Sequence, residues 1–267
     1  MRVTPSRRQD RPTVKKEQKL KIGILGAGSI GATLTRRLST AGHQVKVANS
    51  RGPETIPADL LASGARAVHA SEVAADVDVL IVSVPLNRVP DLKPLLADLP
   101  DDAVIIDTSN YYPMRDDQIK ALDDGQPESL WVAEQYGRPV VKAWNAITSP
   151  SFDTKDSTPG TPGRIAIPVA ADSDTDRALG MALVEETGFD AVDAGTLADS
   201  WRQQPGAPGY CTDLTRDELL AALAKAKAAR SPQRRDLAMT VIAELTTDPL
   251  GDLGEDFLVR VNRLIYN

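Results

Sequence analysis

The sequence predicts a doubly wound α/β fold, with a mostly parallel sheet and a small helical extension at the C-terminal end. Short apolar runs alternate with amphipathic segments from Lys21 to Asp193, the order that right-handed strand–helix–strand units produce. The run Val79–Val84 (VLIVSV) is almost wholly apolar, which is typical of a strand covered on both faces. A glycine-rich turn lies between the first strand and the first helix, as described below.

The predicted strands and helices alternate along the chain. The strands are expected at residues 21–25, 44–48, 66–70, 79–84, 103–107, 139–143, 164–169 and 190–193. The first helix is predicted by Ile30, Leu34 and Leu38, which lie on one helical face, and it ends at Gly42. Further helices are expected at residues 53–63, 72–77, 86–99, 116–122, 130–136, 175–187, 214–229, 232–245 and 255–264. Residues 148–163 are expected to form a loop, and residues 196–213 an irregular connection.

The composition excludes several classes of protein. The 267 residues include 31 Lys and Arg against 37 Asp and Glu, so the net charge of −6 argues against binding nucleic acid by charge. The single cysteine, Cys211, has no partner for a disulfide or a cysteine metal site. No apolar run approaches the ~18 residues that a membrane span needs. We therefore expect a cytoplasmic protein with no membrane or nucleic-acid partner.

Positive charge is concentrated at the N-terminal end. Residues 1–21 contain eight basic and two acidic residues, so the rest of the chain has 23 basic and 35 acidic residues. The segment has no apolar stretch and is therefore not a secretory signal. We expect residues 1–20 to be a disordered basic arm, with organelle targeting as the alternative role.

A glycine motif follows the first predicted strand. Residues 26–31 read GAGSIG, a G-x-G-x-x-G pattern between a strand and an amphipathic helix. In such a loop Gly26 permits a tight turn, Gly28 lets the backbone approach a pyrophosphate, and Gly31 allows close helix packing. The helix N-terminus offers free N–H groups and a partial positive charge to phosphates. Residues 21–195 are therefore predicted to be a Rossmann-type dinucleotide-binding domain, followed by the C-terminal extension, residues 196–267.

The end of the second strand indicates which dinucleotide binds. Enzymes that use NAD commonly place an acid there, about 20 residues after the glycines. This sequence has Asn49, Ser50 and Arg51 instead, with no acid before Glu54. A guanidinium beside a hydroxyl and an amide suits a 2′-phosphate. The predicted cofactor is NADP(H).

The sequence offers no evident acid–base machinery. His43 precedes the second strand, at the edge opposite the ligand crevice, and His69 ends the short third strand. Asp107, Asp172 and Asp174 are interpreted as turn or cap carboxylates. Without a Cys/His cluster, no transition-metal site is predicted.

Six segments carry a family resemblance. In chain order across residues 21–200 they are KIGILGAGSIGATLTRRLSTAGHQV, ANSRGPE, DVLIVSVP, AVIIDTSN, VVKAWN and VDAGTLADS. With them the chain resembles the coenzyme F-420-dependent NADP oxidoreductase family, which is related to the cytosolic reductase domain of the six-transmembrane epithelial metalloreductases. The glycine loop is common to many dehydrogenases. The segments VVKAWN and VDAGTLADS, and SRGPE within ANSRGPE, are more specific to this family.

The resemblance implies a reaction and a set of binding residues. The reaction is hydride exchange between NADPH and a flavin or deazaflavin-type ring, the small-molecule partner, which depends on orientation more than on a protein acid or base. Asn145, after the sixth strand, is expected to orient the reacting rings; the alternative is that it caps the following turn. The residues expected to hold the cofactor are Gly26, Gly28, Ser29, Ile30, Asn49, Ser50, Arg51, Val84, Pro85 and Ala143.

Two other functions remain open at this point. A β-hydroxyacid dehydrogenase or imine reductase also begins with such a domain, but it adds a larger helical domain. In the hydroxyacid group a long helix carries a catalytic lysine, whereas Lys225 and Lys227 here are more simply solvated helix charges. A protein that holds NADP(H) as a redox sensor without turnover is the second alternative. The C-terminal extension is expected to reshape the acceptor site or to form a homodimer surface.

Overall fold

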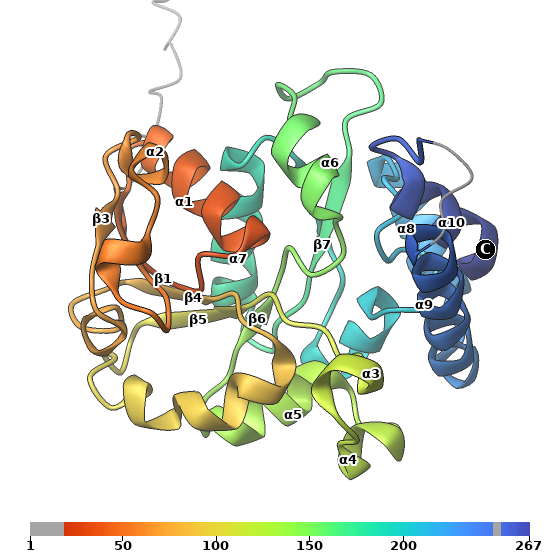
Figure 1. The fold of residues 1–267 in the computed structure, drawn as a ribbon, viewed down its shortest axis with the longest axis horizontal. Helices are drawn as coiled ribbons and strands as arrows, with labels where there is room; N and C mark the ends of the chain where they lie inside the picture. The colour runs from red at the N-terminus through yellow and green to blue at the C-terminus, as the bar shows by residue number, and fades with distance from the viewer. Residues whose placement is uncertain (1–18, 248–251) are drawn as a thin grey trace, which may run out of the picture.

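A computed structural model describes residues 19–247 and 252–267, and in it the main sheet has six parallel strands in the order β3-β2-β1-β4-β5-β6 (Figure 1). The strands are β1 (Lys21–Leu25), β2 (Gln44–Ala48), β3 (Arg66–Ala67), β4 (Val79–Val82), β5 (Val104–Asp107) and β6 (Val141–Lys142). The strand order reverses between β1 and β4, and in such sheets ligands bind in the crevice at this point. The predicted doubly wound fold is confirmed. The predicted basic arm lies outside the described residues, except for Lys19 and Leu20.

Helices cover both faces of the sheet. On one face, α1 (Ser29–Thr40) buries Leu34 and Leu38 against the apolar side chains of β1 and β2. On the other face, a 3-10 helix (Leu86–Leu96) and α5 (Glu128–Tyr136) pack against β4 and β5. The two layers lie above and below the sheet in Figure 1. Both faces of the central strands are therefore dry, which explains their apolar sequences.

Prolines account for two departures from the predicted helices. The segment predicted as a helix at 86–99 is 3-10, because Pro90 and Pro94 lack the N–H groups that an α-helix needs. The helix predicted at 53–63 is divided into a 3-10 turn (Pro53–Thr55) and α2 (Ala58–Leu61), with Pro57 between them. A further short 3-10 helix spans Ala70–Glu72.

Two other predicted segments also differ. The helix expected at 116–122 is replaced by α3 (Pro113–Asp116) and α4 (Lys120–Asp123), separated by Asp117 with a φ of 62°. The loop expected at 148–163 contains α6 (Ser149–Thr154), whose N-cap Thr148 accepts a hydrogen bond from the Ser151 N–H at 3.2 Å. Side-chain capping stabilises this single short turn.

The last predicted strand–helix–strand unit does not extend the main sheet. β7 (Ala166–Val169), α7 (Asp174–Glu186) and β8 (Asp190–Asp193) form a separate two-stranded parallel sheet. One antiparallel bridge, Lys142 to Ala170, connects it to the main sheet. The edge strand β6 is only two residues long, so it offers few backbone N–H and C=O groups for pairing with another strand.

The C-terminal extension packs beside the sheet edge that ends in β6 (Figure 1). It contains the 3-10 helices Leu197–Gln203 and Ala228–Arg230, and the helices α8 (Arg216–Lys225), α9 (Ser231–Thr247) and α10 (Phe257–Tyr266). Its apolar side chains form a cluster of their own that also takes in Ala146, from the loop after β6. Within the described residues, no helix combines the length and the apolar character that crossing a bilayer requires.

Candidate functional site

The three glycines of the loop between β1 and α1 have different surroundings. Gly26 has a φ of 110°, and a Cβ there would clash with the Ser83 carbonyl oxygen. A Cβ on Gly31 would clash with the carbonyl oxygen of Gly26. A Cβ on Gly28 would meet no atom within 4 Å. Gly26 and Gly31 are therefore required by the fold, whereas the space at Gly28 is open to a ligand.

A pocket of about 460 Å³ lies over this loop, and we call it the phosphate-loop pocket. It extends from the glycines across the ends of β2 and β4. Seven of the predicted cofactor residues line it: Gly26, Gly28, Asn49, Ser50, Arg51, Val84 and Pro85. Ser29 is exposed at the first position of α1, next to the loop. The structure thus brings the separate sequence signals for a nucleotide to one concave surface.

The turn after β2 holds Arg51 at the pocket. The Asn49 Oδ1 accepts a hydrogen bond from the Arg51 N–H at 2.9 Å, and the Asn49 Nδ2 donates to the Thr55 Oγ1 at 2.8 Å. Asn49 therefore shapes the turn. Arg51 is exposed, and within the described part of the chain no acid pairs with it. Its guanidinium is free to bind a phosphate.

A second pocket, of about 350 Å³, lies next along the carboxyl edge of the sheet, and we call it the tyrosine pocket. Ile30 of α1 borders it on one side, and Asn110 and Trp144, which follow β5 and β6, form its base. The C-terminal extension forms the opposite wall. The lining side chains that the extension supplies include Tyr210, Met239, Ile242, Leu258, Asn262 and Tyr266.

Asn145 ties three segments together beneath the tyrosine pocket. Its Nδ2 donates to the Asn110 Oδ1 at 3.0 Å and to the Gln203 carbonyl oxygen at 2.8 Å, and its Oδ1 accepts from the Gln203 Nε2 at 3.0 Å. The side chain is buried. Thr148, not Asn145, caps the following helix, so the predicted alternative of a cap is wrong. Because both amide hydrogens are engaged within the protein, Asn145 positions its neighbours.

The sequence did not single out Tyr112, and it indicated Tyr210 only as part of the extension expected to reshape the acceptor site or to form a dimer surface. Their hydroxyl oxygens lie 2.6 Å apart in the tyrosine pocket. Burial raises the pKa of both phenols well above the ordinary value of 10, so both stay protonated at neutral pH. Tyr112 follows β5 and Tyr210 lies in the extension, and no motif connects them. Only the folded chain brings the pair together.

A buried ion pair supports the ends of β5 and β6. The Lys142 Nζ lies 2.6 Å from the Asp107 Oδ2, and both side chains are fully buried. Asp107 also accepts a hydrogen bond from the Ser109 hydroxyl at 3.0 Å, as its interpretation as a turn carboxylate predicts. Lys142 was not recognised as its partner, because a lysine in a strand is most often solvated.

Glu128, at the start of α5, is a second buried acid near this ion pair. Burial raises its pKa to about 7, against the opposing effects of the Lys142 charge and of a hydrogen bond from the Tyr111 N–H. Its Oε2 is buried and has no hydrogen-bond partner among the described residues. Glu128 lines a cavity of about 260 Å³ between the sheet domain and the C-terminal extension.

Neither histidine lines either pocket. The His43 Nδ1 accepts a hydrogen bond from the Leu20 N–H at 3.1 Å, and its Nε2 lies 2.5 Å from the Glu186 Oε2. His43 therefore has a structural role at the opposite edge of the sheet, as predicted. His69 caps a 3-10 turn. Within residues 19–247 and 252–267, no cluster of His, Cys, Asp or Glu is arranged to hold a metal ion.

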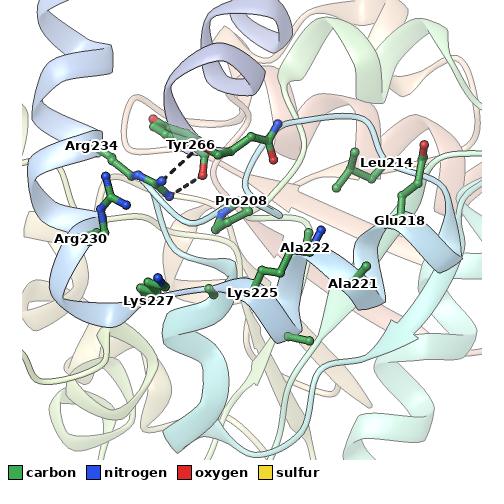
Figure 2. A pocket seen from close by; sticks show the side chains of 13 residues that line it. Pro208, Leu214, Glu218, Ala221, Ala222, Lys225, Lys227, Arg230, Arg234 and Tyr266 are labelled. Atoms are coloured by element: carbon green, nitrogen blue, oxygen red, sulfur yellow. Dashed lines mark hydrogen bonds between the residues drawn. The ribbon is translucent and has the colours of Figure 1, made fainter.

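A groove of about 720 Å³ lies within the C-terminal extension (Figure 2). Lys225 and Lys227 lie on its rim and are exposed. Arg234 donates hydrogen bonds to the carbonyl oxygens of Tyr266 and Asn267. The groove shares only Tyr266 with the tyrosine pocket. The two lysines are thus solvated, as the simpler interpretation predicts.

Comparison with known proteins agrees with this geometry. Residues 21–111 match the family model described as "NADP oxidoreductase coenzyme F420-dependent". The match covers β1 to β5 with the glycine loop and Arg51, so the predicted resemblance is confirmed there. Residues 21–111 are thus similar to an NADP-dependent oxidoreductase family, and this match supports NADP(H) as the nucleotide.

One curated relative and three solved structures extend the comparison. The protein YjhV of Escherichia coli K12 is 46% identical over 68 residues, which are 26% of this chain, and the chain spans about half of that relative's length. The hypothetical protein SMa0349 of Sinorhizobium meliloti is 27% identical with a TM-score of 0.59, over 68% of this chain and 88% of that one.

The other two structures are more distant. A protein from an Arthrobacter species, provisionally named an F420-dependent NADP reductase, is 18% identical with a TM-score of 0.54, over 68% of this chain and 87% of that one. The 3-hydroxyisobutyrate dehydrogenase of Mycobacterium tuberculosis has the same identity and TM-score, over 86% of this chain and 64% of that one. At this identity both show a shared fold alone.

Proposed function

We propose that the protein transfers a hydride between NADPH and a flavin or deazaflavin-type acceptor. The observation that carries the proposal is the row of two pockets on the carboxyl edge of one sheet. Gly28 opens into the first pocket, and Ile30, two residues later, borders the second. A dinucleotide whose pyrophosphate rests at the N-terminus of α1 reaches both pockets.

The residues of the phosphate-loop pocket fit NADPH, which supplies the hydride when bound. The open space at Gly28 admits the pyrophosphate, and the N–H groups of Ser29 and Ile30 have no partner within the first turn of α1. Arg51 and Ser50 donate to the 2′-phosphate. Val84 and Pro85 form an apolar wall for the ribose on the nicotinamide side, a contact that stays a prediction. Ala143, also predicted to hold the cofactor, is fully buried and lines neither pocket.

The lining of the tyrosine pocket favours an acceptor that takes hydride directly. Among the described residues that form it there is no carboxylate, lysine or histidine side chain. A hydroxyacid dehydrogenase needs such a group to move a proton, whereas exchange between two flat rings depends mainly on their orientation. Trp144 and Ile147 provide apolar surface for a ring.

An acceptor screen at saturating NADPH tests the proposal. The purified protein is mixed with 5-deazariboflavin, FMN, FAD or menadione, and the loss of absorbance of NADPH is followed. We expect turnover with the deazaflavin or a flavin, with NADPH strongly preferred over NADH. A matched set of reactions contains a 3-hydroxy acid with NADP⁺, or a cyclic imine with NADPH.

The alternatives give different outcomes in the same screen. Turnover confined to the hydroxy acid or the imine would replace the proposal with a β-hydroxyacid dehydrogenase or imine reductase. NADPH binding without turnover of any acceptor would indicate a redox sensor. The homodimer and the cytoplasmic location stay predictions, which sedimentation velocity and cell fractionation address.

A further inference from the structure

The hydroxyl pair of Tyr112 and Tyr210 has one proton more than its own hydrogen bond uses. Two protonated phenols 2.6 Å apart share a single bond, because one hydroxyl donates and the other accepts. The accepting hydroxyl keeps its own proton for another partner. The Cys211 thiol hydrogen-bonds with Tyr210, and sulfur is a weak acceptor. The Tyr266 phenol also acts electrostatically on both hydroxyls, and Glu128 acts on Tyr112.

The surroundings keep this donor fixed. The Arg115 guanidinium lies 5.2 Å from the centre of the Tyr112 ring and is paired with the buried Asp116 carboxylate at 2.8 Å, and Arg115 also lines the tyrosine pocket. The Cys211 N–H donates to the Ala146 carbonyl oxygen at 3.0 Å, and the Asn262 Nδ2 donates to the Cys211 carbonyl oxygen at 3.2 Å. The segment that carries Tyr210 is therefore bound to the loop after β6 and to α10.

Backbone strain gathers at the same pocket. Trp144 has a φ of 55° and Cys211 a φ of 52°, in the left-handed region that a bulky residue rarely adopts. Both residues line the tyrosine pocket. Such strain costs free energy at each residue, and it persists where the surrounding structure holds a functional geometry. The strain and the spare hydroxyl proton are independent observations on one cavity.

Resting on the proposed function, we propose that the Tyr112–Tyr210 hydroxyl pair donates a hydrogen bond to the nitrogen or carbonyl oxygen of the acceptor ring on which negative charge develops during hydride transfer. The hydride brings two electrons and forms a C–H bond on the acceptor ring, while the C4–H bond of the dihydronicotinamide breaks and NADP⁺ is released. The acceptor gains a negative charge in this step, and a proton from water neutralises it after release. The tyrosines donate hydrogen bonds and stay protonated.

This role agrees with the chemistry of the two phenols. Their high pKa values prevent them from losing a proton to the product, but they do not weaken a hydrogen bond to an anion. A preorganised donor in a pocket that excludes water is worth more to a developing charge than to the neutral ground state. We expect the pair to act mainly on the rate of hydride transfer and less on acceptor binding.

Removal of each hydroxyl tests the proposal with 5-deazariboflavin as the probe. The variants are Tyr210→Phe and Tyr112→Phe. The control is Tyr136→Phe on α5, because the Tyr136 hydroxyl is buried and has no hydrogen-bond partner among the described residues. Two quantities are measured for each protein: turnover of the probe at saturating NADPH, and the Kd of the probe for the NADP⁺-bound protein from tryptophan fluorescence. Thermal melts check that all three variants are folded.

We expect Tyr210→Phe to lower kcat by about tenfold or more and to weaken probe binding by about threefold. The control keeps wild-type values. Turnover at the wild-type rate in both pocket variants would overturn the role of the hydroxyl pair and leave the proposed function intact. Binding that depends on Tyr210 without any turnover would overturn the proposed function and support the hydroxyl contact. A wild-type protein that neither binds nor reduces the probe would overturn both.

Discussion

The phosphate-loop pocket and the tyrosine pocket lie side by side but are assembled from very different stretches of chain. The first is lined by residues between Leu25 and Leu95, and the second by residues from Ile30 to Tyr266. In the first, each role belongs to a local motif, such as the glycine turn. In the second, roles arise only where β5, β6 and the C-terminal extension meet. Nucleotide recognition is thus local, whereas the acceptor side depends on long-range packing.

The largest expected effect breaks the local half of this comparison. Gly28→Val places a branched side chain in the open space over the loop, so nucleotide binding should fall by at least about a hundredfold while the fold remains. A titration monitored by tryptophan fluorescence measures the affinity, and a thermal melt measures stability. Gly31→Ala is the matched control. Its new Cβ would clash with the Gly26 carbonyl oxygen, so this variant should lose stability, whereas Gly28→Val should not. Unchanged NADPH affinity in Gly28→Val would place the ligand elsewhere.

The next effect concerns the boundary between the sheet domain and the extension. The pKa of Glu128 is about 7 in the folded protein, above its ordinary value of 4.5. The folded state therefore holds this proton more tightly than the unfolded state, and that stabilisation is complete below pH 4.5 and lost as the pH rises to about 7. The loss amounts to about 3 kcal/mol.

Glu128→Gln should remove this pH dependence. Chemical denaturation at pH 5 and pH 8 measures the free energy of unfolding. From pH 5 to pH 8, the unfolding free energy of the variant should rise by about 3 kcal/mol relative to that of the wild type. Glu134→Gln is the control, because Glu134 is exposed on the same helix. Parallel pH profiles for wild type and Glu128→Gln would contradict the raised pKa.

A smaller effect sharpens the assignment of the cofactor. Arg51→Ala removes charge-assisted hydrogen bonds worth about 1.5 to 3 kcal/mol, so NADPH should bind roughly ten- to hundredfold more weakly while NADH is hardly affected. Isothermal titration with both nucleotides checks this. Arg66→Ala, at the exposed edge strand β3, should change neither affinity. Equal losses for NADPH and NADH would show that Arg51 does not contact the 2′-phosphate.

The smallest effect tests the long-range half. Asn145→Ala leaves Asn110 and Gln203 without the partners they have in the folded protein, which should cost about 2 kcal/mol of stability. We expect kcat to fall together with stability, because Asn145 positions the base of the tyrosine pocket. Ser173→Ala, which removes the cap of α7, should lower stability without changing kcat. A variant of Asn145 with normal stability would show that its hydrogen bonds contribute little.

The same contrast explains what the sequence could predict. Periodicity and residues close in the chain predict the glycine loop and the turn that carries Arg51. They also predict the succession of strands β1 to β6 along the chain. The sequences AIPV and DAVD of β7 and β8 resemble strands of the main sheet, and only tertiary packing decides that they pair apart from it. Pro90 and Pro94 are visible in the sequence, but their effect on helix type depends on local hydrogen bonds. The Tyr112–Tyr210 pair and the burial of Glu128 have no local signature.

The hydrogen bond between Tyr112 and Tyr210 joins residues 98 positions apart, and this separation has a consequence for the order in which the protein is assembled. Closing so long a segment is entropically costly, and contacts of this kind form slowly compared with local ones. The phosphate-loop pocket needs the chain only up to Leu95, whereas the tyrosine pocket needs the chain up to α10. During synthesis the nucleotide turn is therefore complete long before the wall that the extension provides. Under the proposed function, NADPH binds and stabilises the early sheet, while hydride transfer waits for the last helix to dock.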